Sequence, residues 1–333
     1  MLPQTLLGRQ LRLIGNDLRR GKTTLEELDR MSLAKALSKN GVSKRAIRLI
    51  DISLNYNSID TVSAGGVMQD VERRRSAGTV PLRLKGGNDS FVNALGEAAT
   101  EAGARISLNS RVESISQNTR DVKIRYIGPK GELKTIVADR VVCSLPFSVL
   151  QGISVTPGLS FGKSSAINEV AYTRSTKVFF QAKYAEWDKR SLGSSVWTDT
   201  PLERIFSSTG RLGDEKALFT AWAEGDGSKV LESMPDVERR RYAAAEFVKI
   251  LPFMKDSIEK THSHSWTLDP FARGAYFHYK VGQLNRFQDL MHKPAGRLHF
   301  AGEHTAIKMP GMEGALESAD RVVEEISGVP VKV

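Results

Sequence analysis

The sequence predicts a mixed α+β or α/β fold, and three observations support this. The chain has 333 residues, enough for one large or two ordinary domains of roughly 100–200 residues each. Hydrophobic residues make up 40% and charged residues 26%, which is typical of globular proteins and not of disordered, collagen-like or coiled-coil chains. Segments with helical periodicity stand at both ends of the chain, whereas short strand-like runs lie between them.

The first segment, residues 1–78, is expected to be helical. Between about residues 5 and 75 the apolar residues recur with the spacing of amphipathic helices. Thr23-Thr24 followed by Glu26-Glu27 predicts a capping box at the start of the second helix. Asn40-Gly41 predicts the end of the third helix, because glycine tolerates the left-handed conformation found there.

Residues 79–150 are expected to be rich in strands. A strand over residues 80–85 ends in Gly86-Gly87, and Asp89 or Ser90 is expected to cap a helix over residues 91–102. A turn is expected at residues 128–131. Short strands are expected over residues 104–108, 112–116, 122–126, 135–138 and 140–145.

The rest of the chain reads as α+β. In residues 151–292 we expect strands over 177–181 and 217–222, a helix over 235–251, and then loops rich in aromatic residues. In residues 293–330 we expect a strand over 296–302, a turn, and a helix over 312–326.

The charge and composition of the chain exclude several classes of protein. The net charge of +10 permits binding to anions, but no aromatic residues alternate with the basic clusters, so we expect no nucleic-acid partner. No stretch approaches the roughly 18 unbroken apolar residues of a membrane-spanning helix, and no export signal is visible. The single cysteine, Cys143, excludes an internal disulfide framework and favours a reducing compartment such as the cytoplasm.

The clearest chemical motif lies near the C-terminus. A strand ending at Gly302 leads through Glu303 and a turn into a helix that starts at Met312. The free N–H groups at a helix N-terminus stabilise an electron-rich group, and a carboxylate at the C-terminal end of a strand can accept hydrogen bonds from sugar hydroxyls. The alternative interpretation is an ordinary strand–helix unit with a capping acid.

This terminal stretch resembles the C-terminal FAD-binding motif of the flavin amine oxidase family, which includes L-amino-acid, monoamine and polyamine oxidases. The helical start, with residues 28–33 and 53–57, is most similar to the helical domain of L-amino-acid oxidases. Further matching stretches occur in the family's order at residues 84–88, 112–115, 139–146, 172–180 and 266–276.

The resemblance implies a domain organisation. We expect a partial FAD-binding, Rossmann-like domain interleaved with a mixed-sheet substrate domain and a helical insert. Residues 79–150 and 293–330 would belong to the FAD-binding domain, residues 1–78 to the helical and substrate domains, and residues 151–292 to the substrate-binding domain.

The resemblance also implies cofactor contacts. The backbone of Val112 would hold the adenine, and Glu303 would bind a ribityl or ribose hydroxyl. Trp266 would pack beside the isoalloxazine, although Trp266 and Tyr276 could instead be ordinary core aromatics. The pyrimidine edge of the flavin would lie against Gly311, Met312, Glu313, Gly314 and Ala315.

Lys177 is the catalytic candidate that the resemblance implies. It matches the family lysine that holds a water near flavin N5, where a positive charge assists the reaction with oxygen. The alternative is an exposed strand lysine, because Lys177 alternates with apolar neighbours and could face the other side of a sheet.

Two positions bear on the substrate. Trp222 matches a family tyrosine that contacts the substrate carboxylate, but it could equally be plain pocket lining. Gly311 stands where many relatives have an aromatic wall, which leaves one side of the substrate site open. In the run Gly274-Ala275-Tyr276 the family's tethering cysteine is absent, so we expect non-covalent FAD.

The sequence departs from the family at one essential motif, since no Gly-x-Gly-x-x-Gly occurs in it. We therefore expect the C-terminal portion of an oxidase, explained by a misplaced start or frame break, by a split enzyme whose second chain carries the Rossmann unit, or by a decayed remnant. Alone, the chain is expected to aggregate and to hold little flavin.

The function expected from the resemblance is oxidation of a primary amine or L-amino acid to an imine, with O₂ reduced to H₂O₂. A desaturase or protoporphyrinogen-type oxidase is the rival enzyme, and a non-catalytic remnant or partner subunit is the alternative. We expect no metal site, because His262 and His264 lack a third ligand at metal spacing and His304 reads as structural.

Overall fold

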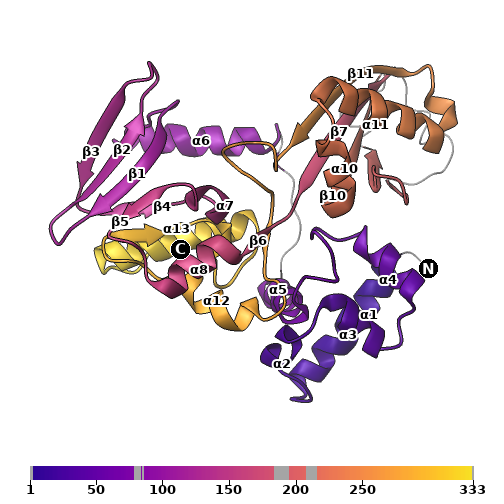
Figure 1. The fold of residues 1–333 in the computed structure, drawn as a ribbon, viewed down its shortest axis with the longest axis horizontal. Helices are drawn as coiled ribbons and strands as arrows, with labels where there is room; N and C mark the ends of the chain where they lie inside the picture. Colours follow the sequence, from indigo (N-terminus) through magenta and orange to yellow (C-terminus); the bar gives the residue numbers. More distant parts are fainter. Residues whose placement is uncertain (1–2, 79–83, 85, 184–194, 208–215, 332–333) are drawn as a thin grey trace. The chain divides into compact units, whose positions relative to one another are not determined.

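The computed structural model describes residues 3–78, 84, 86–183, 195–207 and 216–331 (Figure 1). The chain forms two compact units, each assembled from segments that are distant in sequence. The first unit is drawn from Met1–Val71, Pro146–Val149 and Ser165–Leu290, and the second from Glu72–Leu145, Leu150–Ser164 and Met291–Val333. No helix in the described part of the chain is both long and apolar enough to cross a membrane.

The N-terminal part of the first unit is helical, as the periodicity predicts. The expected capping box is present: the N–H of Glu27 donates to Thr24 Oγ1 over 3.1 Å, and the N–H of Thr24 donates to Glu27 Oε2 over 3.2 Å. Gly41 has a φ of 78° just after the third helix. The helices are α1 (Pro3–Arg19), α2 (Leu25–Asp29), α3 (Leu33–Lys39), α4 (Lys44–Asp51) and α5 (Ala64–Ala77).

A five-stranded antiparallel sheet is the framework of the rest of this unit (Figure 1). One face is apolar and is covered by α10 (Gly225–Glu232) and α11 (Asp236–Ile250). In that core Phe247 stacks on Phe180 at a centroid distance of 4.5 Å. In sheet order the strands are β11 (Ile258–Ser265), β7 (Ser175–Ala182), β10 (Ala217–Glu224), β9 (Arg204–Ser207) and β8 (Ser195–Trp197).

The expectation of aromatic-rich loops after residue 251 is confirmed for residues 266–276, which are turns and bends, and is wrong for the segments on either side, where regular elements occur. The strand β11 gives no sequence signal, since Ile-Glu-Lys-Thr-His-Ser-His-Ser has no apolar alternation. It forms because it pairs with β7 along its length. The other elements are η1 (Pro252–Met254), β12 (Phe277–His278), which pairs with β6 (Ala171–Tyr172), and α12 (Gln283–Met291).

The second unit contains a four-stranded sheet and a separate parallel strand pair (Figure 1). The sheet is β3 (Leu133–Ala138), β2 (Val122–Ile127), β1 (Arg111–Gln117) and β5 (Ser154–Thr156), and the pair is β4 (Val141–Cys143) with β13 (Leu298–Phe300). The helical elements are α6 (Asn88–Glu101), η2 (Glu303–Thr305) and α13 (Met312–Ser327). The helices α7 (Phe147–Leu150) and α8 (Phe161–Glu169) lie where the chain passes between the units.

Two local expectations in this unit are wrong. Residues 104–108 form no strand, and the side chains of Ile106 and Leu108 are 55% and 74% exposed. Apolar alternation makes a strand only where a partner strand supplies hydrogen bonds, and no described strand pairs with this segment. The helix α6 is capped by Gly87, at φ 84°, and not by Asp89 or Ser90. The strand expected over residues 80–85 falls outside the described residues except for Leu84.

Candidate functional site

In the first unit, the sheet face opposite the phenylalanine core carries a lysine between two indoles. Lys177 on β7 is directly paired with Trp222 on β10, and its Nζ lies 4.0 Å from the centre of that ring. The Trp266 ring centre is 5.2 Å from the same Nζ. Both distances suit cation–π attraction. The alternative of a freely exposed strand lysine therefore does not describe Lys177.

The residues after β11 hold Trp266 against the strand that carries Lys177. The N–H of Trp266 donates to the carbonyl of Ser175 over 3.0 Å, and the N–H of Gly274 donates back to the carbonyl of Trp266 over 2.9 Å. Gly274 has a φ of 140°, and a Cβ there would meet Tyr172 Cβ at 2.6 Å, so only glycine fits. Tyr276 is 39% exposed and is not a core aromatic.

Burial lowers the pKa of Lys177 below its ordinary value, and the nearby Arg204 guanidinium acts in the same direction, while the Glu224 carboxyl opposes it. A buried lysine loses the hydration that stabilises its ammonium form, so this form is less favoured than in an exposed lysine. Lys177 therefore releases its proton more readily than an exposed lysine does.

A buried charge cluster continues this face beyond Trp222. Arg204 on β9 is paired with Trp222, its Cζ lies 4.8 Å from the indole centre, and its Nη1 donates to Asn55 Oδ1 over 2.8 Å. Arg204 Nη2 lies 3.4 Å from Glu224 Oε2, and both side chains are almost fully buried. Burial raises the pKa of Glu224 to about 8, although Arg204 opposes the shift.

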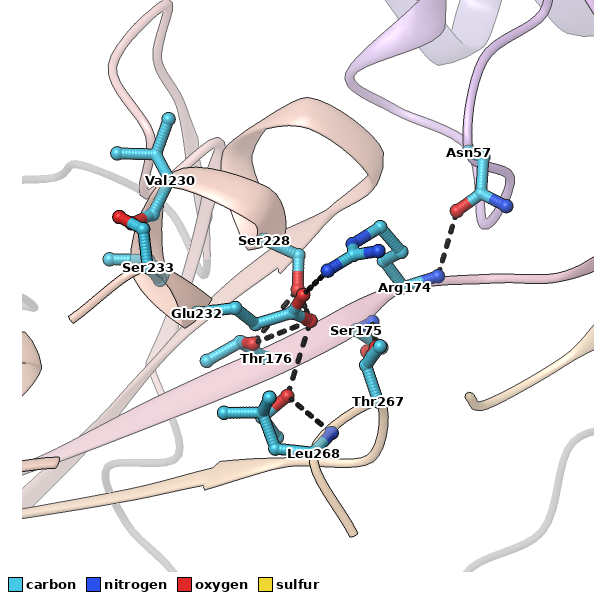
Figure 2. Close-up of polar contacts among 12 residues, drawn as sticks. Asn57, Arg174, Ser175, Thr176, Ser228, Val230, Glu232, Ser233, Thr267 and Leu268 are labelled. Atoms are coloured by element: carbon cyan, nitrogen blue, oxygen red, sulfur yellow. Dashed lines mark hydrogen bonds and ion pairs between the residues drawn. The ribbon is translucent and has the colours of Figure 1, made fainter. Parts of the chain in front are cut away.

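The carboxylate of Glu232 joins the strand ends that precede Lys177 and Trp266 (Figure 2). It accepts hydrogen bonds from Arg174, from Ser228 Oγ over 2.8 Å and from Ser265 Oγ over 3.2 Å. Its side chain is 3% exposed. Because Arg174 precedes β7, Ser265 ends β11 and Ser228 lies on α10, this one carboxylate fixes the positions of three elements.

In the second unit, the glycine turn before α13 presents a bare helix N-terminus. Gly311 is the N-cap at φ 77°, and no side chain caps the helix. A Cβ on Gly314 would lie 2.0 Å from the carbonyl oxygen of Met309, so the turn packs closely on the helix. Met312 is 57% exposed and Glu313 is exposed in the first turn, whereas Ala315 is half-buried. Among the described residues, the first backbone N–H groups of α13 therefore have no side-chain cap.

Other residues fix this turn and the β13–η2 connection. Glu317 accepts hydrogen bonds from the N–H groups of Ile307, Lys308 and Met309 at distances of 2.8–3.0 Å. The N–H of Gly302 donates to Ser318 Oγ over 2.7 Å. Glu303 opens η2 just after this glycine and is half-buried.

His304, the residue after Glu303, is buried, and burial lowers its pKa to about 3. It is therefore neutral at physiological pH, which agrees with a structural role. In the described part of the chain, no group of three or more His, Cys, Asp or Glu side chains is placed to hold a metal ion.

Val112 lies at a bulge in β1. Val112 pairs with Tyr126 and Ser114 pairs with Arg125, so Glu113 is the extra residue and the ladder is interrupted beside Val112. A bulge of this kind frees backbone groups from the ladder, which suits recognition by the main chain.

The structure thus brings the expected residues together in two sets. Lys177, Trp222 and Trp266 lie together in the first unit. Glu303 to Ala315 span η2, the connection after it and the start of α13 in the second unit, where Val112 lies on β1. Sequence reasoning missed Arg204, Glu224 and Glu232. Alternation along β10 could have placed Glu224 beside Trp222, but the partners of Arg204 and Glu232 depend on strand register.

Each set, taken by itself, has features that suit a flavin. An uncapped helix N-terminus with a glycine at its cap suits an electron-rich ring edge, and a closely packed glycine turn allows the backbone to approach it. A lysine with a lowered pKa between two indoles suits a planar redox ring whose charge changes.

Comparison with known proteins identifies the family of the chain. Residues 3–327 match the family model of flavin containing amine oxidoreductases. The chain is 25% identical over 297 residues to the putative L-amino-acid oxidase YobN of Bacillus subtilis (strain 168), covering 83% of this chain and 61% of the relative. It is 29% identical over 254 residues to the flavin-dependent L-tryptophan oxidase RebO of Lentzea aerocolonigenes, covering 74% and 52%.

Solved structures share the fold. Cyclohexylamine oxidase from Brevibacterium oxydans IH-35A has a TM-score of 0.75 at 18% identity, covering 91% of this chain and 69% of that one. Putrescine oxidase bound to putrescine has a TM-score of 0.78 at 17% identity, covering 97% and 76%. This chain spans 61% and 52% of the lengths of the two curated relatives named above.

Proposed function

Because this chain belongs to the family of flavin containing amine oxidoreductases, we propose that it oxidises the C–N bond of a primary amine or L-amino acid to an imine. In this proposal O₂ is reduced to H₂O₂ and the imine hydrolyses to a carbonyl compound and ammonia. FAD would supply the two-electron acceptor, which no protein side chain provides.

The observation that carries the proposal is Lys177 held between Trp222 and Trp266. Trp266 would pack beside the isoalloxazine, and Lys177 would hold a water and place positive charge where oxygen is reduced. Its lowered pKa supports proton exchange with that water, because a partly desolvated lysine releases its proton more readily than a solvated one.

The other expected residues would bind and orient. Gly311, Met312, Glu313, Gly314 and Ala315 would hold the pyrimidine edge of the flavin through the N-terminus of α13. Glu303 would accept a hydrogen bond from a ribityl or ribose hydroxyl, and the backbone at Val112 would hold the adenine. The run Gly274-Ala275-Tyr276 offers no thiol, so the cofactor would be non-covalent.

Trp222 and Gly311 would contact the substrate. The indole N–H of Trp222 donates to Ser175 Oγ over 3.2 Å, so its ring orientation is fixed. With that donor engaged, Trp222 would act chiefly as an apolar wall, and the glycine at position 311 would leave space for the substrate.

A non-catalytic remnant or a subunit that acts with a second chain is the alternative. The test is the visible flavin absorbance of the purified chain, alone and after co-expression with the polypeptide encoded immediately upstream. Flavin in either preparation supports the oxidase, and colour only in the pair supports a two-chain enzyme. The absence of flavin from both preparations would support the non-catalytic remnant.

A further inference from the structure

A histidine lies next to Lys177 on the same sheet. Lys177 on β7 has two directly paired neighbours, which are Trp222 on β10 and His264 on β11. In an antiparallel pair the side chains of directly opposite residues lie on the same face, with Cβ atoms roughly 4.5–5.5 Å apart. His264 therefore flanks Lys177 on the side away from Trp222, on the outermost strand of the described sheet.

The contacts of the neighbouring residues confirm the face on which His264 lies. Ser263 and Ser265 are buried, and their hydroxyls donate to the carboxylates of Asp236 on α11 and Glu232 on α10, the helices that cover the core face. Successive residues of a strand point to opposite faces. His264 is therefore on the face opposite the core, as Lys177 is.

The imidazole of His264 packs on Trp266, the tryptophan expected beside the flavin. The centres of the two rings are 4.6 Å apart and their planes are at 84°, which is an edge-to-face contact. The centre of the same indole ring is 5.2 Å from Lys177 Nζ. One tryptophan thus has both the lysine and the histidine against it.

A carboxylate that is fixed by its own turn lies near the imidazole. Asp269 Oδ2 is 3.9 Å from His264 Nε2. The other oxygen, Asp269 Oδ1, accepts the N–H of Phe271 over 2.8 Å, and the N–H of Asp269 donates to the carbonyl of Ser265 over 3.2 Å. Asp269 therefore attracts the imidazolium whenever His264 carries a proton.

His264 also meets solvent. Its side chain is 42% exposed, and that of Asp269 is 31% exposed. Histidine is the side chain that most readily exchanges protons with water near neutral pH. His264 thus connects the solvent with the sheet face on which Lys177 lies.

We propose that His264 supplies a proton that the reduction of O₂ consumes, through the water that Lys177 would hold. This inference rests on the proposed oxidase function. Conversion of O₂ to H₂O₂ takes up two electrons and two protons, of which the reduced flavin supplies both electrons and one proton. For the second, an N–H bond of the His264 imidazolium breaks, the water passes one proton on, and an O–H bond of H₂O₂ forms. The neutral imidazole then regains a proton from solvent.

Charged groups from the neighbouring elements face this pair. Asp269 approaches His264 from the turn after β11. Arg204 on β9 disfavours the ammonium form of Lys177, and Glu224 on β10 favours it. A proton on His264 is attracted by Asp269 and repelled by the ammonium of Lys177, so its release depends on the charge of both.

The first test is the reoxidation of flavin-loaded protein whose flavin has been photoreduced, which needs no amine. On stopped-flow mixing with O₂, His264→Gln is expected to slow the return of flavin absorbance by roughly 10²-fold, the lower end of the usual contribution of a general acid. The rate in the parent protein is expected to fall between about pH 5 and 8, as histidines lose their protons, and to change much less in the variant. An unchanged rate, or a variant with the pH dependence of the parent, overturns the proposal.

His262→Gln is the matched control. His262 lies on the same face of β11 but pairs with Phe179, and its ring stacks on that phenylalanine at a centroid distance of 6.2 Å. This variant is expected to reoxidise at the rate of the parent. Added imidazole is expected to restore reoxidation in His264→Ala but not in Lys177→Met. A rate in His264→Ala that imidazole does not restore contradicts proton delivery and indicates a packing role against Trp266.

The second test needs no turnover. In the NMR spectrum of the oxidised, substrate-free protein at about pH 7, the imidazole resonance of His264 is the one that disappears in His264→Gln. It is expected to move toward the neutral position in Asp269→Asn, because an anion is lost, and toward the protonated position in Lys177→Met, because a cation is lost. A resonance that responds to neither replacement overturns the proposal.

These measurements separate the role of His264 from the oxidase reaction. A flavin that no amine reduces, but that reoxidises more slowly in His264→Gln after photoreduction, contradicts the amine reaction and supports proton delivery. A flavin that amines reduce, with reoxidation in His264→Gln as in the parent, supports the oxidase and contradicts proton delivery.

Discussion

Lys177 and Trp222 are cross-strand partners in β7 and β10, and the lysine Nζ lies 4.0 Å from the centre of the indole ring. Strand alternation puts both side chains on the face opposite the core, because their neighbours Val178, Ala221 and Ala223 belong to the apolar core cluster. It places a partly desolvated cation on an aromatic surface, which is the feature most directly related to the proposed chemistry.

Replacement of Lys177 by methionine keeps the stem and removes the charge. The proposed role in oxygen reduction predicts that kcat/KM for O₂ falls by roughly 10²–10³, the usual effect of removing one preorganised electrostatic group. Anaerobic reduction of the flavin by substrate should change much less. Stopped-flow measurement of the two half-reactions separates these effects.

Lys183→Met is the control for that variant. Lys183 is exposed just beyond the end of β7, so its replacement should leave both half-reactions unchanged. Equal slowing of reduction and reoxidation in Lys177→Met would contradict a specific role in the oxygen step.

Replacement of Glu232 by glutamine tests the contact that joins β7, β11 and α10. Loss of the charge weakens the bonds from Arg174, Ser228 and Ser265, and we expect the free energy of unfolding to fall by about 1–3 kcal/mol. Urea denaturation with an unchanged m-value measures this. Glu238→Gln, at an exposed position of α11, is the matched control and should have no effect.

The buried carboxyls predict a pH dependence of stability. Glu224 has a raised pKa of about 8 in the fold against an ordinary 4.5, so the folded state binds more protons than the unfolded state between these values. Its contribution to stability is complete below about pH 4.5 and is lost as pH rises to about 8. Glu203, with a pKa of about 7, acts in the same direction.

Thermal unfolding between pH 5 and 8 checks this dependence. Glu224→Gln should flatten the fall in melting temperature with rising pH, whereas Glu259→Gln should leave the profile as in the parent protein. A Glu224→Gln profile as steep as that of the parent would show that Glu224 does not titrate in this range.

The close packing of Gly314 near the start of α13 predicts that a larger residue at this position weakens flavin binding. A Cβ at position 314 would lie 2.0 Å from the carbonyl oxygen of Met309, so Gly314→Ala forces the turn and the helix apart, at about 1–3 kcal/mol. The flavin-loaded Gly314→Ala variant should lose more flavin during gel filtration than the parent protein does. Gly158→Ala in the same unit, where a Cβ meets no atom within 4 Å, should retain flavin as the parent does.

Local signals in the sequence predict those elements whose stability is local. Apolar spacing and the Thr24–Glu27 capping box identify the N-terminal helices, and strand propensity identifies β1, β2, β7 and β10. Residues 104–108 have the same strand propensity but no described partner, and β11 has a partner but no propensity. Pairing decides both cases, and pairing is a property of the folded chain.

The same distinction holds for the candidate site. The family resemblance identifies individual residues because each of its motifs is contiguous in sequence. That Lys177 and Trp222 share one sheet face depends on the pairing of β7 with β10. The contacts of Arg204 with Trp222 and Glu224 depend on the register in which β9 pairs with β10. Glu232 accepts hydrogen bonds from residues in or beside three separate elements, so no local sequence pattern predicts these contacts.

The oxidase proposal is tested most directly by anaerobic addition of amines and L-amino acids to the flavin-loaded protein, followed by its visible flavin absorbance. We predict bleaching by at least one compound of this panel, and return of the absorbance with formation of H₂O₂ when O₂ is admitted. A flavin that stays oxidised with every amine and amino acid would contradict oxidation of the C–N bond as the reaction.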